Sequence, residues 1–138
     1  MKNTCSEIPK VYEIKPSTEI CPMKTVQDLI AGKWKIMILW YLSLKIRRFN
    51  ELQRLLPYAS RSILTQHLRE LEKDGIVHRE VYKEVPPKVE YSLTETGNSF
   101  ITVLNAMGKW GESYLDYKKT DDRRKNVNRR RNGNCKKS

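Results

Sequence analysis

Apolar residues recur at helical spacing in three successive segments after residue 20. The first, PMKTVQDLIAG (22–32), keeps its apolar residues on one side and begins with a proline, which is favoured in the first turn of a helix. The second, KWKIMILWYLSL (33–44), is apolar nearly all round, as expected of a helix at the centre of a core. The third, FNELQRLLP (49–57), is one-sided again and ends at a proline. The pattern therefore predicts three helices, with the second one central.

A fourth helix is predicted between two end signals. Ser60 is a good N-cap for RSILTQHLRELEKD, and Gly75 should end the helix. At 100° per residue, the core-facing half comprises Ile63, Leu64, His67, Leu68 and Leu71.

The period changes after Gly75. IVHREVY (76–82) and VEYSL (89–93) alternate and are rich in β-branched and aromatic residues, so they predict a hairpin that turns at KEVPPK (83–88). Thr94 should then cap a long final helix that reaches Tyr117. The order of the elements predicts a mainly α fold with a small β-hairpin wing: a winged helix-turn-helix with flanking helices.

Charge divides the 138 residues unevenly. The chain carries a net charge of +11, but residues 1–117 hold 17 Lys and Arg against 14 Asp and Glu, whereas residues 118–138 hold 10 against 2. We expect a flexible arm (1–20), one DNA-binding and dimerisation domain (21–117) and a disordered basic tail (118–138) that contacts polyanions or serves as a solubilising extension.

Cysteine usage and the apolar runs indicate a cytoplasmic protein. The three cysteines, at positions 5, 21 and 135, show no paired spacing, which favours a reducing compartment. The N-terminus lacks the apolar core of a secretory signal. The most apolar run (34–44) is too short to cross a bilayer, so no membrane association is expected.

Five stretches in series resemble the HxlR-type winged-helix transcriptional regulators of bacteria and archaea. They are CP before the first helix, GKWKIMIL, RRFNELQRLLP, ILTQHLRELEKDGIVHREVY and VPPKVEYSLTETG, and together they cover residues 21–115. The resemblance implies a dimeric DNA-binding regulator. It also implies that the cysteine before the first helix can sense electrophiles or oxidants, as it does in some members.

The outer face of the fourth helix has chemistry suited to reading DNA. In a helix-turn-helix the second helix enters the major groove, where Gln pairs with adenine, Arg pairs with guanine, and Ser or Thr bonds to phosphates or bases. The candidate residues are Ser60, Arg61, Ser62, Thr65, Gln66, Arg69 and Lys73.

Cations elsewhere are candidates for backbone contacts. The wing carries Arg79, Lys83 and Lys88, partly offset by acidic residues, and the two lysines that flank its turn are the preferred contacts. Further candidate phosphate clamps are Lys33, Lys35, Arg47 and Arg48. Arg48 stands where related proteins often have a small polar capping residue, so capping should be weaker here.

The last helix carries more apolar surface than a small three-helix core needs. We expect part of it to form a two-fold interface with the first helix, although both helices could instead complete the monomer core. The candidate interface residues are Val26, Leu29, Ile30, Phe100, Leu104, Met107, Trp110, Gly111 and Tyr114.

Cys21 stands at the start of a helix, where the helix dipole and nearby Lys24 should favour a thiolate. It is a candidate redox sensor, with Cys5, Cys135 or the Cys21 of a second copy as partner thiol, or else a small residue without a regulatory role. Neither His67 nor His78 has neighbours at metal-ligand spacing, and both are expected to pack structurally. The chain shows no catalytic constellation, and no enzyme activity, metal or cofactor is expected.

These features together predict a sequence-specific regulator that binds double-stranded DNA as a homodimer on an inverted repeat. An oxidant or small-molecule effector acting through Cys21 is compatible with this function. The alternative is a winged-helix module for protein contacts or non-specific nucleic-acid binding, with its affinity supplied by the basic tail.

Overall fold

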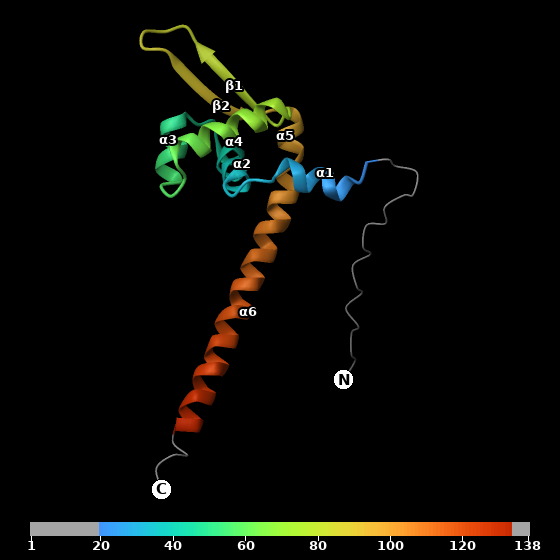
Figure 1. Ribbon diagram of the computed structural model, residues 1–138, viewed down its shortest axis with the longest axis vertical. Helices are drawn as coiled ribbons and strands as arrows, with labels where there is room; N and C mark the ends of the chain where they lie inside the picture. Colours follow the sequence, from blue (N-terminus) through green and yellow to red (C-terminus); the bar gives the residue numbers. More distant parts are fainter. Residues whose placement is uncertain (1–19, 134–138) are drawn as a thin grey trace.

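The computed structural model describes residues 20–133, with side chains described as far as residue 130. The elements are α1 (Pro22–Leu29), α2 (Lys35–Leu44), α3 (Phe49–Leu55), α4 (Arg61–Lys73), β1 (Val77–Tyr82), β2 (Lys88–Leu93), α5 (Glu95–Ser99) and α6 (Ile101–Gly133). Their order and arrangement confirm a winged helix-turn-helix (Figure 1). Most of the predicted N-terminal arm, with Cys5, lies outside the described residues, as does Cys135.

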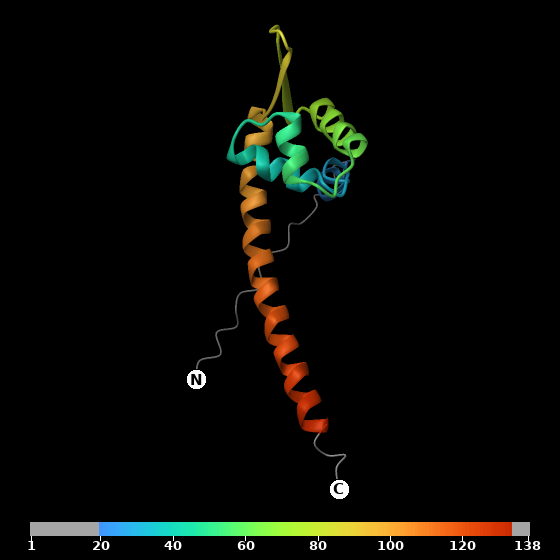
Figure 2. The same ribbon diagram turned by 90° about the vertical axis from the view of Figure 1, so that its left-hand side faces the viewer.

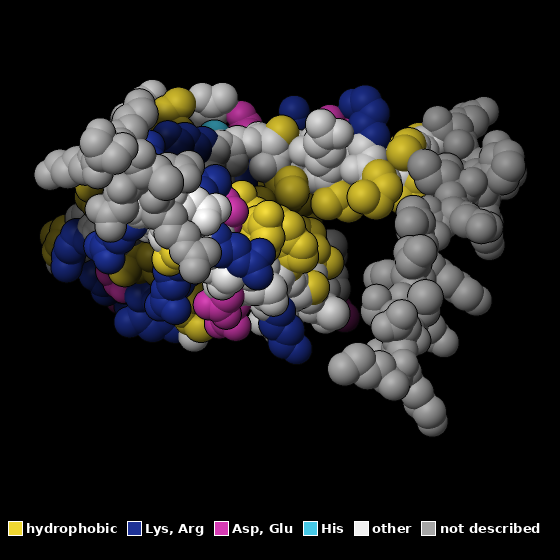
Figure 3. Space-filling view, turned by 90° about the horizontal axis from the view of Figure 1, so that it is seen from below, with side chains coloured by type: hydrophobic (Ala, Val, Ile, Leu, Met, Phe, Trp, Pro, Cys, Tyr) yellow, Lys and Arg dark blue, Asp and Glu magenta, His cyan; other side chains and the backbone are white. Residues whose placement is uncertain are grey.

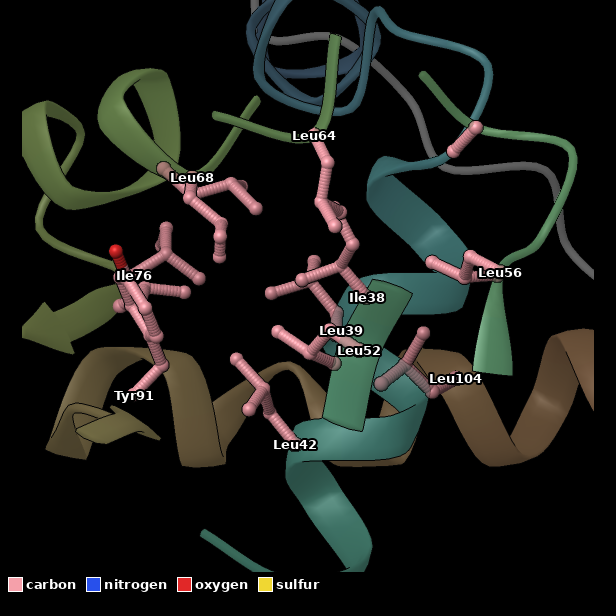
Figure 4. Close-up of a cluster of buried hydrophobic side chains, with 13 residues drawn as sticks. Ile38, Leu39, Leu42, Leu52, Leu56, Leu64, Leu68, Ile76, Tyr91 and Leu104 are labelled. Atoms are coloured by element: carbon pink, nitrogen blue, oxygen red, sulfur yellow. The ribbon is translucent and has the colours of Figure 1, made fainter. Parts of the chain in front are cut away.

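The core forms where α2, α3 and α4 meet. α2 contributes Ile38 and Leu39, which are almost fully buried, as its all-round apolar pattern predicted. Leu52 of α3 and three leucines of α4 surround them (Figure 4). Four of the five residues predicted to face inward from α4 are buried. Ile63 is the exception, because its place in the first turn leaves 38% of it exposed.

The predicted helix ends are confirmed by their caps. The Ser60 hydroxyl accepts a hydrogen bond from the Ile63 N–H at 3.1 Å, and Gly75 ends the α4 region with a φ of 75°. The Thr94 hydroxyl accepts from the Gly97 N–H at 3.0 Å. The final helix is interrupted at Phe100, so Thr94 caps the short α5 rather than one continuous helix.

The wing is an antiparallel pair in which Arg79 lies opposite Tyr91. Arg47, just before α3, exchanges two backbone hydrogen bonds with Tyr91 and so ties the base of β2 to the helical part. His78, which was expected to pack, is exposed on β1, and its Nε2 lies 2.6 Å from a Glu80 carboxylate oxygen. The expectation for His78 was wrong, because alternate residues of β1 face away from the helices.

The basic tail was expected to be disordered, and the structure differs from that expectation. α6 continues through residue 133, so the described part of the tail is helical. No proline interrupts the segment, and a Lys125–Asp121 ion pair of 2.6 Å at i,i+4 spacing supports the helix. The free end of α6 and the wing project in opposite directions in both views (Figures 1 and 2). Within residues 20–133, no helix is apolar over a bilayer-spanning length.

Candidate nucleic-acid interface

The outer face of α4 gathers most of the predicted reading residues around one open hollow. The hollow has a volume of about 740 Å³ and is lined by Arg61, Ser62, Thr65, Gln66, Arg69 and Glu70. The helical period explains the grouping, since residues three and four apart share a face. Lys73 belongs to the same helix and is exposed, but it lies outside this hollow.

Lys35 neutralises the acidic residue of this face. Its side chain is only 3% exposed, and its Nζ lies 2.5 Å from the Glu70 Oε2. The hydrogen bond from Lys35, assisted by one from Gln66, lowers the pKa of Glu70, so the carboxylate stays ionised. Lys35 was expected to contact phosphate; that expectation was wrong, because the ammonium is buried against α4.

Gln66 is positioned by the same cluster. Its Nε2 donates to the Glu70 Oε1 at 2.9 Å, which leaves the amide oxygen and a second N–H for a ligand. The pair lies at i,i+4 spacing on an exposed part of the helix. The cluster therefore presents both a donor and an acceptor outward, which is what pairing with an adenine edge requires.

The N-terminal end of α4 is held by local contacts. Arg61 stacks its guanidinium over the Phe49 ring, 4.8 Å from the centroid, and Thr65 donates to the Arg61 carbonyl at 2.8 Å. Ser60 is engaged as the N-cap, yet it is exposed. These contacts orient the first turn, whose residues meet bases in a helix-turn-helix.

The remaining candidate cations are either paired with a carboxylate or exposed to solvent. Arg47 is nearly buried: its guanidinium lies over the Tyr41 ring and 3.8 Å from Glu51, so the expected phosphate contact was wrong. Lys88 is partly buried and pairs with Glu90 at 3.0 Å. Of the remaining candidates, Lys33, Arg48 and Lys83 are exposed.

Arg48 is the N-cap residue of α3, and its side chain makes no capping hydrogen bond, as its basic character predicted. Lys33 is held over the Trp34 ring at 5.1 Å. Both side chains remain accessible beside the helical domain. Lys83 lies between β1 and the tip of the wing, where a DNA backbone would pass.

Arg79 was noted in the sequence but not placed in the site. The structure turns it toward α4, where it lines a second notch with Thr65, Arg69, Glu72 and Tyr91. The signal that could have found it is the hairpin register, because the residue opposite buried Tyr91 must share its face.

A large apolar surface stays open on α1 and α6. No residue of α1 is buried, and Val26 is 39% exposed. On α6 the exposed apolar residues include Met107, Trp110 and Tyr114, with the last two rings stacked at 5.2 Å. Figure 3 shows hydrophobic side chains along α1 and on the surface adjoining it.

Three of the predicted interface residues are engaged in the monomer instead. Leu104 is 6% exposed and belongs to the core. Phe100 and Leu29 pack against the same core and are partly buried. The expectation that Leu104 is available to a partner was therefore wrong, because the first turn of α6 lies against α2.

Cys21 is the N-cap residue of α1, as its position before Pro22 predicted, and its thiol is half-buried and free. Lys24 is turned toward Asp28, with its Nζ 2.8 Å from the carboxylate, so this cation is paired within the helix rather than with the thiol. Among the described residues, no group of His, Cys, Asp and Glu could hold a metal ion.

Comparisons with known proteins agree with this arrangement. The family model for the HxlR-like helix-turn-helix matches residues 29–119. The uncharacterised HTH-type transcriptional regulator YdeP of Bacillus subtilis is 53% identical over 98 residues, covering 71% of this chain and 77% of the relative.

Two solved structures of the redox regulator HypR are also similar. The oxidised form is 50% identical with a TM-score of 0.65 and covers 67% of this chain and 96% of its own. The reduced form is 47% identical with a TM-score of 0.69 and covers 72% and 99%. The wing, the outer face of α4 and these matches together show that the chain belongs to the HxlR-like helix-turn-helix family of DNA-binding transcriptional regulators.

Proposed function

We propose that this regulator binds an inverted-repeat DNA site as a homodimer and reads bases through α4. The observation that supports this most is the outward face of α4, where Gln66 and Arg61 are oriented by neighbouring contacts and Glu70, the acid in the hollow, is neutralised by Lys35. Such a protein would act in the cytoplasm, where the chromosome of a bacterium or archaeon lies.

The homodimer is supported by the state of α1. An eight-residue helix is marginal in water alone, and within one chain α1 has no fully buried residue, only the partly buried Leu29 against the core. The open apolar surfaces of α1 and of residues 107–114 give a second copy a place to bury them. A two-fold axis there would set two α4 helices on one side of a duplex.

Redox control through Cys21 is the finer part of the proposal. HypR is described as a redox regulator with oxidised and reduced structures, and it is about half identical to this chain. Cys21 stands at the start of α1, a helix assigned to the dimer interface. An oxidant such as diamide would take the two thiol hydrogens of two Cys21 residues, one per protomer, and leave a disulfide, which would change how the two protomers sit.

Two experiments test the proposal. Deletion of residues 118–138 should weaken binding to all DNA but preserve the preference for a selected duplex over a scrambled one. Loss of all preference would favour the alternative, a module whose basic tail supplies its affinity; the 10 Lys and Arg of this segment are the observation behind that alternative.

The redox part is tested with diamide. The wild type should change its affinity for the selected duplex after diamide treatment, and Cys21→Ser should not. Cys5→Ser and Cys135→Ser serve as matched controls that identify a partner thiol. An equal response of the wild type and Cys21→Ser would contradict sensing at Cys21.

A further inference from the structure

A notch of about 270 Å³ opens between α4, the proposed recognition helix, and the wing. One wall is α4, with Thr65, Arg69 and Glu72, and the other is the hairpin, with Arg79 and Tyr91. Two arginines from different elements thus line one small space, with a single acidic residue.

The pairing of β1 with β2 determines which side chains form the second wall of the notch. Arg79 and Tyr91 are directly opposite in the antiparallel ladder, so their side chains share one face of the hairpin. Tyr91 is also held from its other side, because Arg47 donates to its carbonyl at 3.0 Å and accepts from its N–H at 2.7 Å. The base of the wing is therefore anchored to the helical domain.

The two arginines and the tyrosine hydroxyl of the notch have no side-chain partner within residues 20–130. Neither Arg69 nor Arg79 has a carboxylate oxygen within 4.0 Å there, unlike Lys35 and Lys88, which are both paired. Tyr91 is 9% exposed, with its ring in the core (Figure 4), and no described residue bonds its hydroxyl. The hydroxyl is not fully buried, and without a protein partner it is open to a ligand or water at the notch.

We propose that this α4–wing notch holds one backbone phosphate of the bound duplex, with Arg69 and Arg79 as its ligands and the Tyr91 hydroxyl as a further donor. A phosphodiester carries one negative charge and accepts the paired N–H groups of a guanidinium. The strand between a major groove, entered by α4, and the adjacent minor groove, beside the wing, passes this notch. The inference rests on the proposed docking of α4.

This assignment gives Arg69 a different role from the base-reading role that the sequence predicts. Arg69 then contributes affinity and register rather than base discrimination, because phosphate contacts position a protein without reading sequence. Arg61 and Gln66 remain the base-reading candidates.

The salt dependence of binding tests the shared phosphate. Binding constants for the selected duplex are measured from low to physiological salt for Arg69→Gln, Arg79→Gln and the double variant. One shared phosphate predicts that the double variant lowers the slope of log K against log salt by about 0.9. Two separate phosphates predict about 1.8, and an unchanged slope means none; either result would overturn the proposal.

Lys109→Gln is the matched charge control, because Lys109 is exposed on α6 and does not line the notch. Its slope should equal that of the wild type. The ranking of single-base variants of the duplex should also stay the same in Arg69→Gln. Relaxed preference at one position would show that Arg69 reads a base.

Ethylation interference gives a second measure should the double variant fold poorly. Among the ethylated phosphates that block the wild type, one per half-site should lose that effect in Arg79→Gln; an unchanged interference pattern would contradict the proposal. Titration with inorganic phosphate distinguishes a DNA phosphate from a free small anion. If phosphate binds in a way that depends on Arg79, while the salt dependence of DNA binding is unchanged in the variants, the notch is a site for a small anion and the proposal fails. If the wild type shows no preference for any duplex, the proposed function itself fails.

Discussion

The ammonium of Lys35 lies 2.5 Å from the Glu70 carboxylate, and this contact joins the central helix to the recognition helix. The two partners differ in exposure: the Lys35 side chain is 3% exposed, whereas that of Glu70 is 39% exposed. The pair therefore has a buried cationic end and a partly hydrated acidic end.

This asymmetry predicts unequal costs for the two truncations. Glu70→Ala leaves a buried ammonium unpaired and should lower the free energy of unfolding by about 3 kcal/mol. Lys35→Met leaves a carboxylate that water still reaches, and should cost about 1 kcal/mol. Urea unfolding at neutral pH measures both. Equal costs, or the reverse order, would contradict the described burial.

The surroundings of His67 predict that the free energy of unfolding depends on pH. Burial, assisted by the positive charge of Lys35 and opposed by Glu70, lowers the pKa of His67, and Gly32 packs directly against the ring. The unfolded chain therefore binds a proton more readily than the folded chain. The stability contribution is complete above the unfolded pKa of about 6.5 and is lost as the pH falls through the window below it.

His67→Gln should flatten this dependence. The wild type is expected to lose more stability than the variant between pH 7 and pH 5, measured by urea unfolding at each pH. A variant as pH-sensitive as the wild type would show that other groups cause the effect.

Met107 tests the dimer surface. It is 38% exposed in one chain, so Met107→Glu should leave the fold and its helical content intact. At a buried two-fold contact the same change places two charges in apolar surroundings, and the dimer dissociation constant should rise at least about tenfold. Sedimentation equilibrium measures it, with Asn105→Glu on the same helix as the control. Unchanged association of Met107→Glu would exclude this surface.

The surroundings of Gly97 and Gly108 predict opposite effects of replacing each glycine with alanine. A Cβ at Gly97 would collide with the Ile76 carbonyl, where α5 lies against the start of β1, and Gly97→Ala should cost about 2 kcal/mol or more. Gly108 of α6 has open space around it, and Gly108→Ala should stabilise by about 0.5 to 1 kcal/mol. Thermal unfolding compares them, and a tolerated Gly97→Ala would contradict the close approach.

Local signals in the sequence predicted much of the fold. Ser60 and Thr94 cap helices where expected, because a capping hydroxyl bonds within its own turn. The hairpin followed from its alternation and its paired prolines. The outward residues of α4 followed from the helical period alone, and five of the seven predicted reading residues line one hollow.

The features that sequence reasoning missed depend on contacts between distant segments. Nothing near Lys35 in the sequence indicates that its partner is Glu70, which lies two helices later in the chain, on the outer face of α4. Arg47 is held by Tyr41 and Glu51, and so its charge is not free as composition suggested. The helical extension of α6 was missed because composition predicted disorder, whereas favourable i,i+4 pairing within the tail supports a helix.

Selection from a pool of randomised duplexes tests the central claim, that two copies of α4 read an inverted repeat. The account predicts enrichment of a palindrome whose half-site centres lie about 10 base pairs apart, or a multiple of that spacing. It also predicts that Gln66→Ala, selected in parallel, loses preference at one position in each half-site. An asymmetric single site, or no enriched sequence at all, would contradict the account.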